Sequence, residues 1–446
     1  MPQIVFSKYL HAVRVGGKVA LFHELHPNPI YCRKEQWDEV SKFHQPQQGC
    51  LLDVMRLEKL VLAEAAEDVA ELSLVKSEIK RKYSIPFALH LITANDCNMS
   101  CGYCPFRSGT GNGRMMSSDD ARKGLTLWSR TLWEKHKPDN DYSIIFYGGE
   151  PLLNKKVIRD TLEIVERFKR DGLLPQNLIT VIATNGLLVD DDVLGWCKKY
   201  RVSVQVGLDG DENRNDRHRV DSRGNGVGRV VIGKIKQLVS NKIETSISVS
   251  LTSQNFEGID ETWSFVESLG VKKFGFNLIR GFGHGSSLVP SDYYHQAARH
   301  LASRLHRNNS RNCVEFSLER KINAFRNRDF FPQDCACYGN QLVILPDGYI
   351  SNCPFSREII GHLDWVSDAF QIEKAGLVRH WRNRLPPDCD GLVEFPATAL
   401  YGGGCAWHCK EYYSNDLVVD ERIKWFAQEV MNEIIKSEMF GVQCAD

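Results

Sequence analysis

The sequence predicts an α/β fold: a partial (β/α)6 barrel with a small α+β unit before it and a cysteine-rich extension after it. Two observations lead to this prediction. Between residues 85 and 310, short apolar runs typical of buried strands alternate with amphipathic helical stretches, and such units form right-handed crossovers in a parallel sheet. Six strand runs of this kind are present, too few for a closed eight-stranded barrel.

The predicted barrel strands end in polar and glycine-rich motifs. Because the carboxyl ends of parallel strands meet at one edge, where α/β proteins place their chemistry, we expect the motif loops to converge on one mouth. The strand runs cover residues 87–94, 142–149, 178–186, 202–210, 244–251 and 272–279. The motifs at the first four strand ends are NDCNMSCGYC (95–104), GGEP (148–151), TNG (184–186) and LDG (208–210).

Residues 1–84 form the predicted N-terminal unit. Alternating apolar residues on both sides of Gly16-Gly17 predict a hairpin, and residues 28–32 predict a third strand. Helical patterns follow at 34–43 and 67–83. The boundary to the barrel is placed at the proline that follows Ser84-Ile85.

Residues 311–446 form the predicted C-terminal extension. Strand and helix signals become sparse there, apart from a hairpin with its turn at Pro346-Asp347-Gly348. Eight of the fourteen cysteines of the chain lie in this region. We therefore expect the extension to depend on bound metal more than on a large apolar core.

Composition restricts the class of protein. Lys and Arg together number 56, as do Asp and Glu, so no overall charge favours nucleic acid or anionic lipid. The apolar runs are too short to span a membrane, and charges interrupt the N-terminal stretch where a signal peptide is apolar. We expect a soluble cytoplasmic protein without nucleic-acid or membrane partners. In that reducing compartment, clustered cysteines indicate metal or redox chemistry.

Three cysteines lie close together in the first polar loop, at Cys97, Cys101 and Cys104. A zinc site with a fourth ligand from elsewhere is one explanation, and small buried hydrophobes are another. An iron–sulfur cluster is a third, because four irons held by three thiolates leave one iron free to bind a substrate or cofactor. The spacing alone leaves these explanations open.

Tyr103 comes before the last cysteine of this loop, and the motifs YGGEPLLN (147–154) and ATNGLL (183–188) follow at the next two strand ends. With these motifs, the loop resembles the signature of the radical S-adenosylmethionine (radical SAM) enzymes. The resemblance covers roughly residues 85–285. It implies a [4Fe–4S] cluster on the three cysteines, with S-adenosylmethionine (SAM) on the open iron. It further implies cleavage of SAM to methionine and a 5′-deoxyadenosyl radical that takes a hydrogen atom from the substrate.

The GGEP motif suits a role that the resemblance implies. Gly148 and Gly149 would let the backbone approach the methionyl end of SAM. Glu150 would accept hydrogen bonds from the ammonium group of SAM, and Pro151 would stiffen the turn. Taken without the resemblance, the glycines are simply turn residues.

The TNG motif and the aromatic residue of the cysteine loop have similar expected roles. Thr184 and Asn185 are short polar groups suited to hydrogen-bonding the ribose hydroxyls of SAM. Tyr103 would lie against the adenine. For Asn185 in isolation, an Asx turn is the simpler explanation.

The fourth strand end departs from the family pattern. Related proteins often have Ser-x-Asp-Gly there, whereas Gly207 replaces the serine here. Any contact made by that hydroxyl is lost, and Asp209 is a weak site candidate. Arg219 is a candidate to balance the SAM carboxylate, but a solvated surface arginine is the simpler expectation.

The C-terminal extension resembles the SPASM extension of radical SAM peptide-modifying enzymes. The resemblance rests on Cys337-x10-Gly348-x4-Cys353 and on the Gly-Gly-Gly that precedes Cys405. The paired C-x2-C knuckles of a zinc ribbon do not occur in this extension. The resemblance implies one auxiliary [4Fe–4S] cluster, held by Cys335 together with Cys337, Cys353 and Cys405.

A second auxiliary cluster has less support. Its expected cysteine positions are occupied by Leu392, Phe395 and Tyr401. Four other cysteines of the extension match no spacing that predicts a site, and three isolated ones are expected to be small buried hydrophobes. The four are Cys313, Cys389, Cys409 and Cys444. The three isolated ones are Cys32, Cys50 and Cys197.

This architecture predicts a maturase that abstracts hydrogen from a residue of a ribosomally made peptide and forms a thioether or carbon–carbon cross-link. The expected partners are a precursor peptide, or a protein side chain, and a reductant of the flavodoxin or ferredoxin type. The N-terminal unit could bind the leader of the peptide as an additional strand. The alternatives are peptide epimerisation, with Cys313 as a hydrogen donor to test, formylglycine formation as in anaerobic sulfatase maturation, and a non-catalytic iron–sulfur electron carrier. No catalytic base is predicted.

Overall fold

The computed structural model describes most of the chain. The residues outside the description are 1–4, 24, 43–49, 63–65, 83–85, 106–112, 136–140, 280–286, 291, 306–312, 327–334, 339, 356–357, 367–403, 416–417 and 442–446. Cys389 and Cys444 therefore lie outside the described residues, as do the three positions of the degenerate second cluster set.

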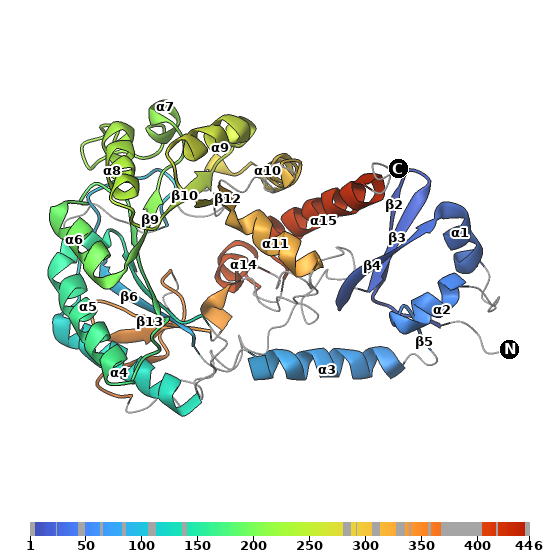
Figure 1. Ribbon diagram of the computed structural model, residues 1–446, viewed down its shortest axis with the longest axis horizontal. Coiled ribbons are helices and arrows are strands. Elements are labelled where there is room, and N and C mark those ends of the chain that lie inside the picture. Colours follow the sequence, from blue (N-terminus) through green and yellow to red (C-terminus); the bar gives the residue numbers. More distant parts are fainter. Residues whose placement is uncertain are drawn as a thin grey trace.

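A ten-stranded sheet forms the centre of the fold, and it contains the six strands that the sequence predicts (Figure 1). These six strands are neighbours in chain order and are all parallel. The predicted α/β class with a parallel barrel sheet is confirmed. The strands are β6 (Ala88–Ala94), β7 (Ser143–Gly148), β8 (Ile179–Thr184), β9 (Ser203–Gly207), β10 (Thr245–Leu251) and β11 (Lys273–Leu278).

Helices between the strands cover the outer side of the sheet (Figure 1). In α5, Val157, Ile158, Leu162 and Val165 recur at helical spacing and are buried in the main core. This burial fixes which side of the helix faces the sheet. The helices are α4 (Ser118–Lys135), α5 (Lys155–Arg170), α6 (Asp191–Tyr200), α7 (Glu212–Asn215), α8 (Gly228–Ser240), α9 (Ile259–Ser268) and α10 (Tyr293–Ala302).

The sheet continues beyond the six predicted strands at both edges. β12 (Val314–Glu315) pairs with β11, and β13 (Gln341–Ile344) pairs with β6, in both cases parallel. β13 and β14 (Tyr349–Ser351) form the predicted hairpin, and β15 (Gly361–His362) pairs with β14. The C-terminal hairpin is therefore joined directly to the first strand of the barrel.

The expectation of sparse helices beyond residue 310 is wrong at the end of the chain. There α15 (Glu421–Gly441) runs for 21 residues. Its apolar side chains recur at helical spacing, for example at Phe426, Val430 and Ile434, and join the main core. The helix packs against α10 and against α11 (Phe316–Arg326). The extension thus has apolar support in addition to its cysteines.

The N-terminal unit contains the predicted strands and helices and three elements that the sequence did not predict. Its three-stranded antiparallel sheet has the order β2-β3-β4. The predicted elements are β2 (Leu10–Val15), β3 (Lys18–His23), β4 (His26–Arg33), α1 (Lys34–Lys42) and α3 (Ala66–Lys82). The others are α2 (Cys50–Leu57) and a small sheet of β1 (Val5–Phe6) and β5 (Val61–Leu62).

The tail helix α15 connects the N-terminal unit to the barrel, and Figure 1 shows it between β2 and α11. Lys18 on β3 donates a hydrogen bond to the carbonyl oxygen of Met439 at 3.1 Å. Tyr31 on β4 donates to the carboxylate of Glu438. Among the described residues, no helix is both long and apolar enough to cross a bilayer.

Candidate metal and cofactor site

The three predicted cluster cysteines lie on the loop that leaves β6 at the carboxyl end of the sheet, residues 95–104, called here the cysteine loop. Two backbone hydrogen bonds hold this loop against the segment after β9. Ser100 N donates to Val220 O at 2.9 Å, and Gly102 N donates to His218 O at 3.0 Å. All three cysteines of the loop are partly exposed and form no disulfide.

The donor set of the cysteine loop fits an iron–sulfur cluster. Burial raises the pKa of Cys97 to about 12, and the neighbouring thiols of Cys101 and Cys104 act in the same direction. Within the described part of the chain, no three His, Cys, Asp or Glu side chains form a site for a single metal ion. The thiolates of a cubane bind separate irons at its corners. Three thiols presented by one loop, Cys97, Cys101 and Cys104, are a donor set of the kind that such a cluster uses.

Gly148 and Gly149 are required by the close approach of two strand ends. A Cβ at Gly148, where φ is +140°, would overlap the carbonyl oxygen of Ala94 at the end of β6. A Cβ at Gly149 would overlap the carbonyl oxygen of Asp96, the residue before Cys97. The two glycines therefore bring the GGEP turn into direct contact with the start of the cysteine loop.

Glu150 is the centre of a hydrogen-bond network at this turn. Its buried carboxylate accepts from Leu152 N at 2.9 Å, Thr184 Oγ1 at 2.7 Å and Asn185 N at 2.8 Å. Burial raises the pKa of Glu150, and these hydrogen bonds act in the opposite direction. The carboxylate also caps the short helix η1 (Pro151–Asn154), which begins at the predicted proline. One side chain thus joins the ends of β7 and β8.

The expectation that Arg219 is a solvated surface residue is wrong. The residue is 9% exposed, and its Nε lies 3.0 Å from Oδ2 of Asp209. Burial acts to lower the pKa of Arg219, but the neighbouring groups, Asp209 first among them, together raise it above its ordinary value. Tyr103 donates its hydroxyl to the same carboxylate, and its ring centre lies 5.7 Å from the Arg219 guanidinium. Asp209, a weak candidate from sequence, therefore connects the cysteine loop to the fourth strand end.

The glycine at position 207 provides the space for this arginine. A Cβ at Gly207 would lie 2.5 Å from Nη1 and 2.7 Å from Nη2 of Arg219. A serine at this position would collide with the guanidinium. The departure from the family pattern is thus coupled to the buried Asp209–Arg219 pair.

A second cysteine group lies at the opposite, amino-terminal end of the first barrel strand. β13 begins at Gln341, which is opposite Ala88 at the start of β6. The chain enters β13 from this end, and the antiparallel β14 returns to it. The cysteines at this end form the four-cysteine set, defined as Cys335, Cys337, Cys353 and Cys405.

The thiols of the four-cysteine set interact with one another. A hydrogen bond with Cys335, together with burial, raises the pKa of Cys337 well above its ordinary value. The thiols of Cys353 and Cys405 act on it in the same direction. Cys337 and Cys353 pack with Ala406 in one small buried cluster. The structure therefore brings together all four residues that the family resemblance implies as ligands of an auxiliary cluster.

A buried ionic network that sequence reasoning missed supports Cys405. Asp420 accepts from Cys405 N at 3.1 Å and from Arg422 Nε at 3.0 Å, and it lies 3.2 Å from Nδ1 of His408. Burial opposes ionisation, but the charges of Arg422 and His408 hold the pKa of Asp420 well below its ordinary value. A Cβ at Gly404, where φ is +82°, would overlap Asp420. The last glycine before Cys405 is required by this contact.

The remaining described cysteines lie away from the barrel mouth. Cys313 is buried beside the start of β11, where Val314 N donates to Lys272 O. That is the amino end of the sheet, so the structure gives no support to Cys313 as a hydrogen donor at the cysteine loop. Cys32 and Cys197 are buried, as expected of small hydrophobes.

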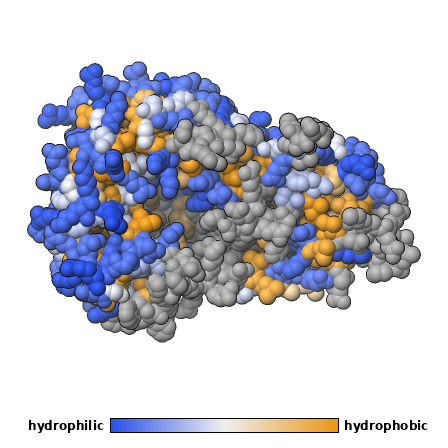
Figure 2. Space-filling view, viewed as in Figure 1, coloured by the Kyte–Doolittle hydropathy of each residue, from blue (hydrophilic) through white to orange (hydrophobic). Residues whose placement is uncertain are grey.

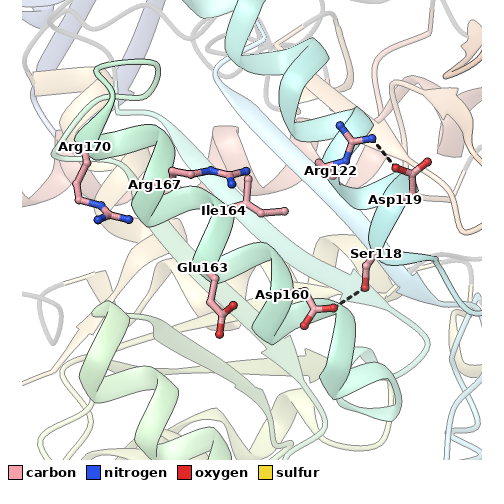
Figure 3. Close-up of a pocket in the computed structure, with 8 residues that line it drawn as sticks. All are labelled: Ser118, Asp119, Arg122, Asp160, Glu163, Ile164, Arg167 and Arg170. Carbon is pink, nitrogen blue, oxygen red and sulfur yellow. Dashed lines mark hydrogen bonds and ion pairs between the residues drawn. The ribbon is translucent and has the colours of Figure 1, made fainter.

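A groove of about 610 Å³ lies on the outer side of the barrel between α4 and α5 (Figure 3). Some of its charged side chains are paired, as Arg122 is with Asp119 and Asp160 with Ser118. No cysteine lines it. The groove is therefore separate from both cysteine sites.

Comparison with protein families decides what kind of domain the barrel is. Residues 91–266 match the radical SAM superfamily. This segment is a radical SAM domain. The cofactors of a radical SAM domain are a [4Fe–4S] cluster and SAM, and the cysteine loop beside the Glu150 network fits them. Members of the superfamily are enzymes.

Known proteins similar to the chain include maturation enzymes. The cysteine-type anaerobic sulfatase-maturating enzyme of Clostridium novyi (strain NT) is 24% identical over 212 residues, which are 45% of this chain and 54% of that protein. The antilisterial bacteriocin subtilosin biosynthesis protein AlbA of Bacillus subtilis (strain 168) is 23% identical over 367 residues, which are 79% of this chain and 74% of AlbA. This chain spans about half the length of the sulfatase-maturating relatives.

Most of the chain shares its fold with a solved structure. anSMEcpe with bound AdoMet superposes with a TM-score of 0.64 at 16% identity, over 79% of this chain and 98% of that one. At this identity the likeness concerns the fold.

Proposed function

We propose that the protein is a radical SAM peptide maturase that removes a hydrogen atom from a residue of a ribosomally made peptide and forms a thioether or carbon–carbon cross-link. The observation that carries the proposal is the presence of two different cysteine groups at the two ends of one barrel. The similarity to AlbA, a protein of bacteriocin biosynthesis, supports a peptide substrate.

At the barrel mouth, the cysteine loop would hold the [4Fe–4S] cluster, which when bound supplies the electron that cleaves SAM. Oε1 of Glu150 already accepts two hydrogen bonds, whereas Oε2 accepts one, from Asn185 N. Oε2 therefore keeps a lone pair for the ammonium group of SAM. The residues proposed to border SAM are Tyr103, Gly148, Gly149, Glu150, Pro151, Thr184 and Asn185.

Arg219 is proposed to bind the carboxylate of SAM. Its Nε is engaged with Asp209, and the fork of the guanidinium leaves the terminal nitrogens for a second carboxylate. Asp209 would fix the orientation of the guanidinium. Because the guanidinium is buried, a carboxylate bound to it would be poorly screened by solvent.

The four-cysteine set is proposed to hold one auxiliary [4Fe–4S] cluster. Joining two X–H groups of a peptide removes one hydrogen atom, one proton and one electron. The hydrogen atom goes to the adenosyl radical, and the electron requires an acceptor. An iron–sulfur cluster at the amino end of the barrel would provide that acceptor.

The N-terminal unit is proposed to recognise the peptide. β2 is an edge strand whose side chains alternate between partly buried and exposed positions, a suitable partner for an added strand. Figure 2 shows apolar side chains over this unit, and Leu57, Val69 and Leu74 are among its exposed residues. The units 1–84, 85–310 and 311–446 remain predictions, as does a flavodoxin- or ferredoxin-type reductant.

The test is anaerobic reconstitution with iron and sulfide, followed by dithionite and SAM. A radical SAM enzyme releases 5′-deoxyadenosine, whereas an iron–sulfur electron carrier does not. Co-expression with the product of a short neighbouring reading frame then tests the substrate, since each cross-link removes the mass of two hydrogens. Absence of 5′-deoxyadenosine from the reconstituted protein contradicts the proposal.

Formylglycine formation is the second candidate, because sulfatase-maturating enzymes are among the relatives. A sulfatase-derived peptide distinguishes the two candidates: formylglycine formation converts its Cys or Ser to an aldehyde, which a carbonyl-reactive probe detects. Epimerisation leaves the mass unchanged in ordinary water and adds a deuteron in heavy water.

A further inference from the structure

We propose that Asn185 is a positioning residue that donates an N–H···S hydrogen bond to Cys97 and thereby raises the reduction potential of the cluster at the cysteine loop. This inference rests on the proposed function, because it assumes a cluster on Cys97. It assigns to Asn185 a role toward the cluster that goes beyond its expected place beside SAM.

The orientation of the Asn185 amide is fixed by its surroundings. Leu187 N donates to Oδ1 of Asn185 at 3.0 Å, so the opposite side of the amide must carry Nδ2. Nδ2 lies 2.7 Å from Oδ1 of Asn98 and 3.6 Å from Sγ of Cys97. Its two hydrogens thus have two acceptors within the chain, one of which is the thiol sulfur.

The backbone of Asn185 is fixed as well. Its N–H donates to Oε2 of Glu150 at 2.8 Å, and the residue is 9% exposed. Asn185 therefore links the Glu150 turn, where the ammonium group of SAM is proposed to bind, to the first cysteine of the cluster loop. The same residue contacts the carboxylate of Glu150 through its backbone and the sulfur of Cys97 through its side chain.

A hydrogen bond to a cluster sulfur stabilises the reduced state, because reduction adds negative charge that the N–H dipole opposes. The donor lies in a partly buried site, where such a dipole is less screened than in water. Loss of the donor should make the potential more negative and reduction by a given electron donor less complete.

The experiment is an EPR-monitored redox titration of the reconstituted full chain without peptide, comparing wild type with Asn185→Leu and Asn185→Asp. The cluster at the cysteine loop is recognised as the one whose reduced signal changes when SAM is added. Both variants should show a more negative midpoint potential with unchanged iron content, and Asn185→Asp should show the larger shift because it also adds a negative charge. In D2O, the electron–nuclear coupling of an exchangeable deuteron should be lost in Asn185→Leu.

Asn154→Leu is the matched control. Nδ2 of Asn154 donates hydrogen bonds to the carbonyl oxygens of Thr93 and Met116 at the same barrel mouth, and these bonds involve no sulfur. The midpoint potential of the cluster in Asn154→Leu should therefore equal that in the wild type. Unchanged potential and deuteron coupling in Asn185→Leu overturn the inference. If Asn185→Leu loses iron, Asn185→Asp replaces it in the test, because this variant keeps the shape of the side chain. Its midpoint potential and its deuteron coupling are then compared with those of the wild type. Loss of iron from both variants overturns a tuning role. A wild-type protein with no SAM-sensitive signal contradicts the proposed function instead.

Discussion

The cysteine loop and the four-cysteine set lie at opposite ends of the same barrel and differ in their surroundings. All three thiols of the loop are partly exposed, and Glu150, Asn185 and Arg219 supply polar groups around them. In the four-cysteine set, Cys337 and Cys353 are 0% and 4% exposed and pack in an apolar cluster. The cysteine loop is partly exposed and polar, whereas the four-cysteine set is buried except at Cys335.

The difference follows from the number of thiols. Four thiolates complete the coordination of a cubane, so its protein surroundings can exclude water and be apolar. Three thiolates leave one iron open, and a charged cofactor that binds there must be able to reach it and must find polar partners. The comparison agrees with the proposal that SAM binds at the cysteine loop and that the four-cysteine set holds an electron acceptor.

Replacement of all three loop cysteines should have the largest effect. The Cys97/Cys101/Cys104→Ala variant should lose about four irons, the content of one cubane, and all release of 5′-deoxyadenosine. Iron and sulfide analysis with product chromatography measures both. Cys197→Ala, at an isolated buried thiol, is the control. Retention of SAM cleavage by the triple variant would refute the assignment.

Replacement of a cysteine in the four-cysteine set should separate the cleavage of SAM from the modification of the peptide. Cys337→Ala should also lose about four irons but should continue to release 5′-deoxyadenosine, because the loop cluster remains. Modification of the precursor peptide should fall to background, since the electron acceptor is missing. Mass spectrometry of co-expressed peptide measures this loss. If Cys337→Ala cross-links the peptide at the wild-type rate, the four-cysteine set has a structural role alone.

Gly207→Ser should affect the cysteine loop moderately. The added side chain collides with the guanidinium of Arg219 and should displace it from Asp209. SAM affinity should fall on the order of tenfold, or about 1.4 kcal/mol, while iron content stays constant. Equilibrium dialysis measures the affinity. Gly233→Ser on α8, where a Cβ has no neighbour within 4 Å, is the control, and equal affinities in both variants would contradict the role of Arg219.

Asp160→Asn, remote from both cysteine sites, should have the smallest effect. Hydrogen bonds from Lys156 and Ser118 lower the pKa of Asp160 to about 2. A carboxylate with a lowered pKa stabilises the fold above its ordinary pKa, and this contribution is lost as the pH falls through about 2. Near neutral pH the variant should lose no more than about 1 kcal/mol of unfolding free energy, because the pair is near the surface.

Urea unfolding at several pH values measures this difference, which should vanish near pH 2. A difference in unfolding free energy between the variant and the wild type that grows as the pH falls would contradict this prediction. Iron content and SAM cleavage of Asp160→Asn should match wild type, which makes it a stability control for the other variants.

Features encoded within one local segment could be predicted from the sequence. The six barrel strands follow from alternating apolar and helical stretches, and the cysteine loop and the GGEP turn each lie within one loop. The four-cysteine set could be predicted because the family resemblance supplies its spacing. The tail helix is visible as apolar periodicity in α15, but the density of cysteines in the extension directed attention to metal instead.

Pairs that meet only in the folded state could not be predicted. Gly207 and Arg219 are separated along the chain, and the missing side chain has meaning only when the guanidinium is seen to fill its place. The same holds for Gly404 and Asp420. Asn185 carried a motif, but its contact with Cys97 depends on how β8 lies beside the cysteine loop.

The central claim is that one of two cubanes is open to SAM and the other is closed. EPR spectra of the reduced wild-type protein, recorded with and without SAM, test it most directly when compared with the Cys97/Cys101/Cys104→Ala variant. We expect SAM to alter one of the wild-type signals and none of the signals that remain in the variant. A SAM-dependent change in the variant, or none in the wild type, would contradict the account.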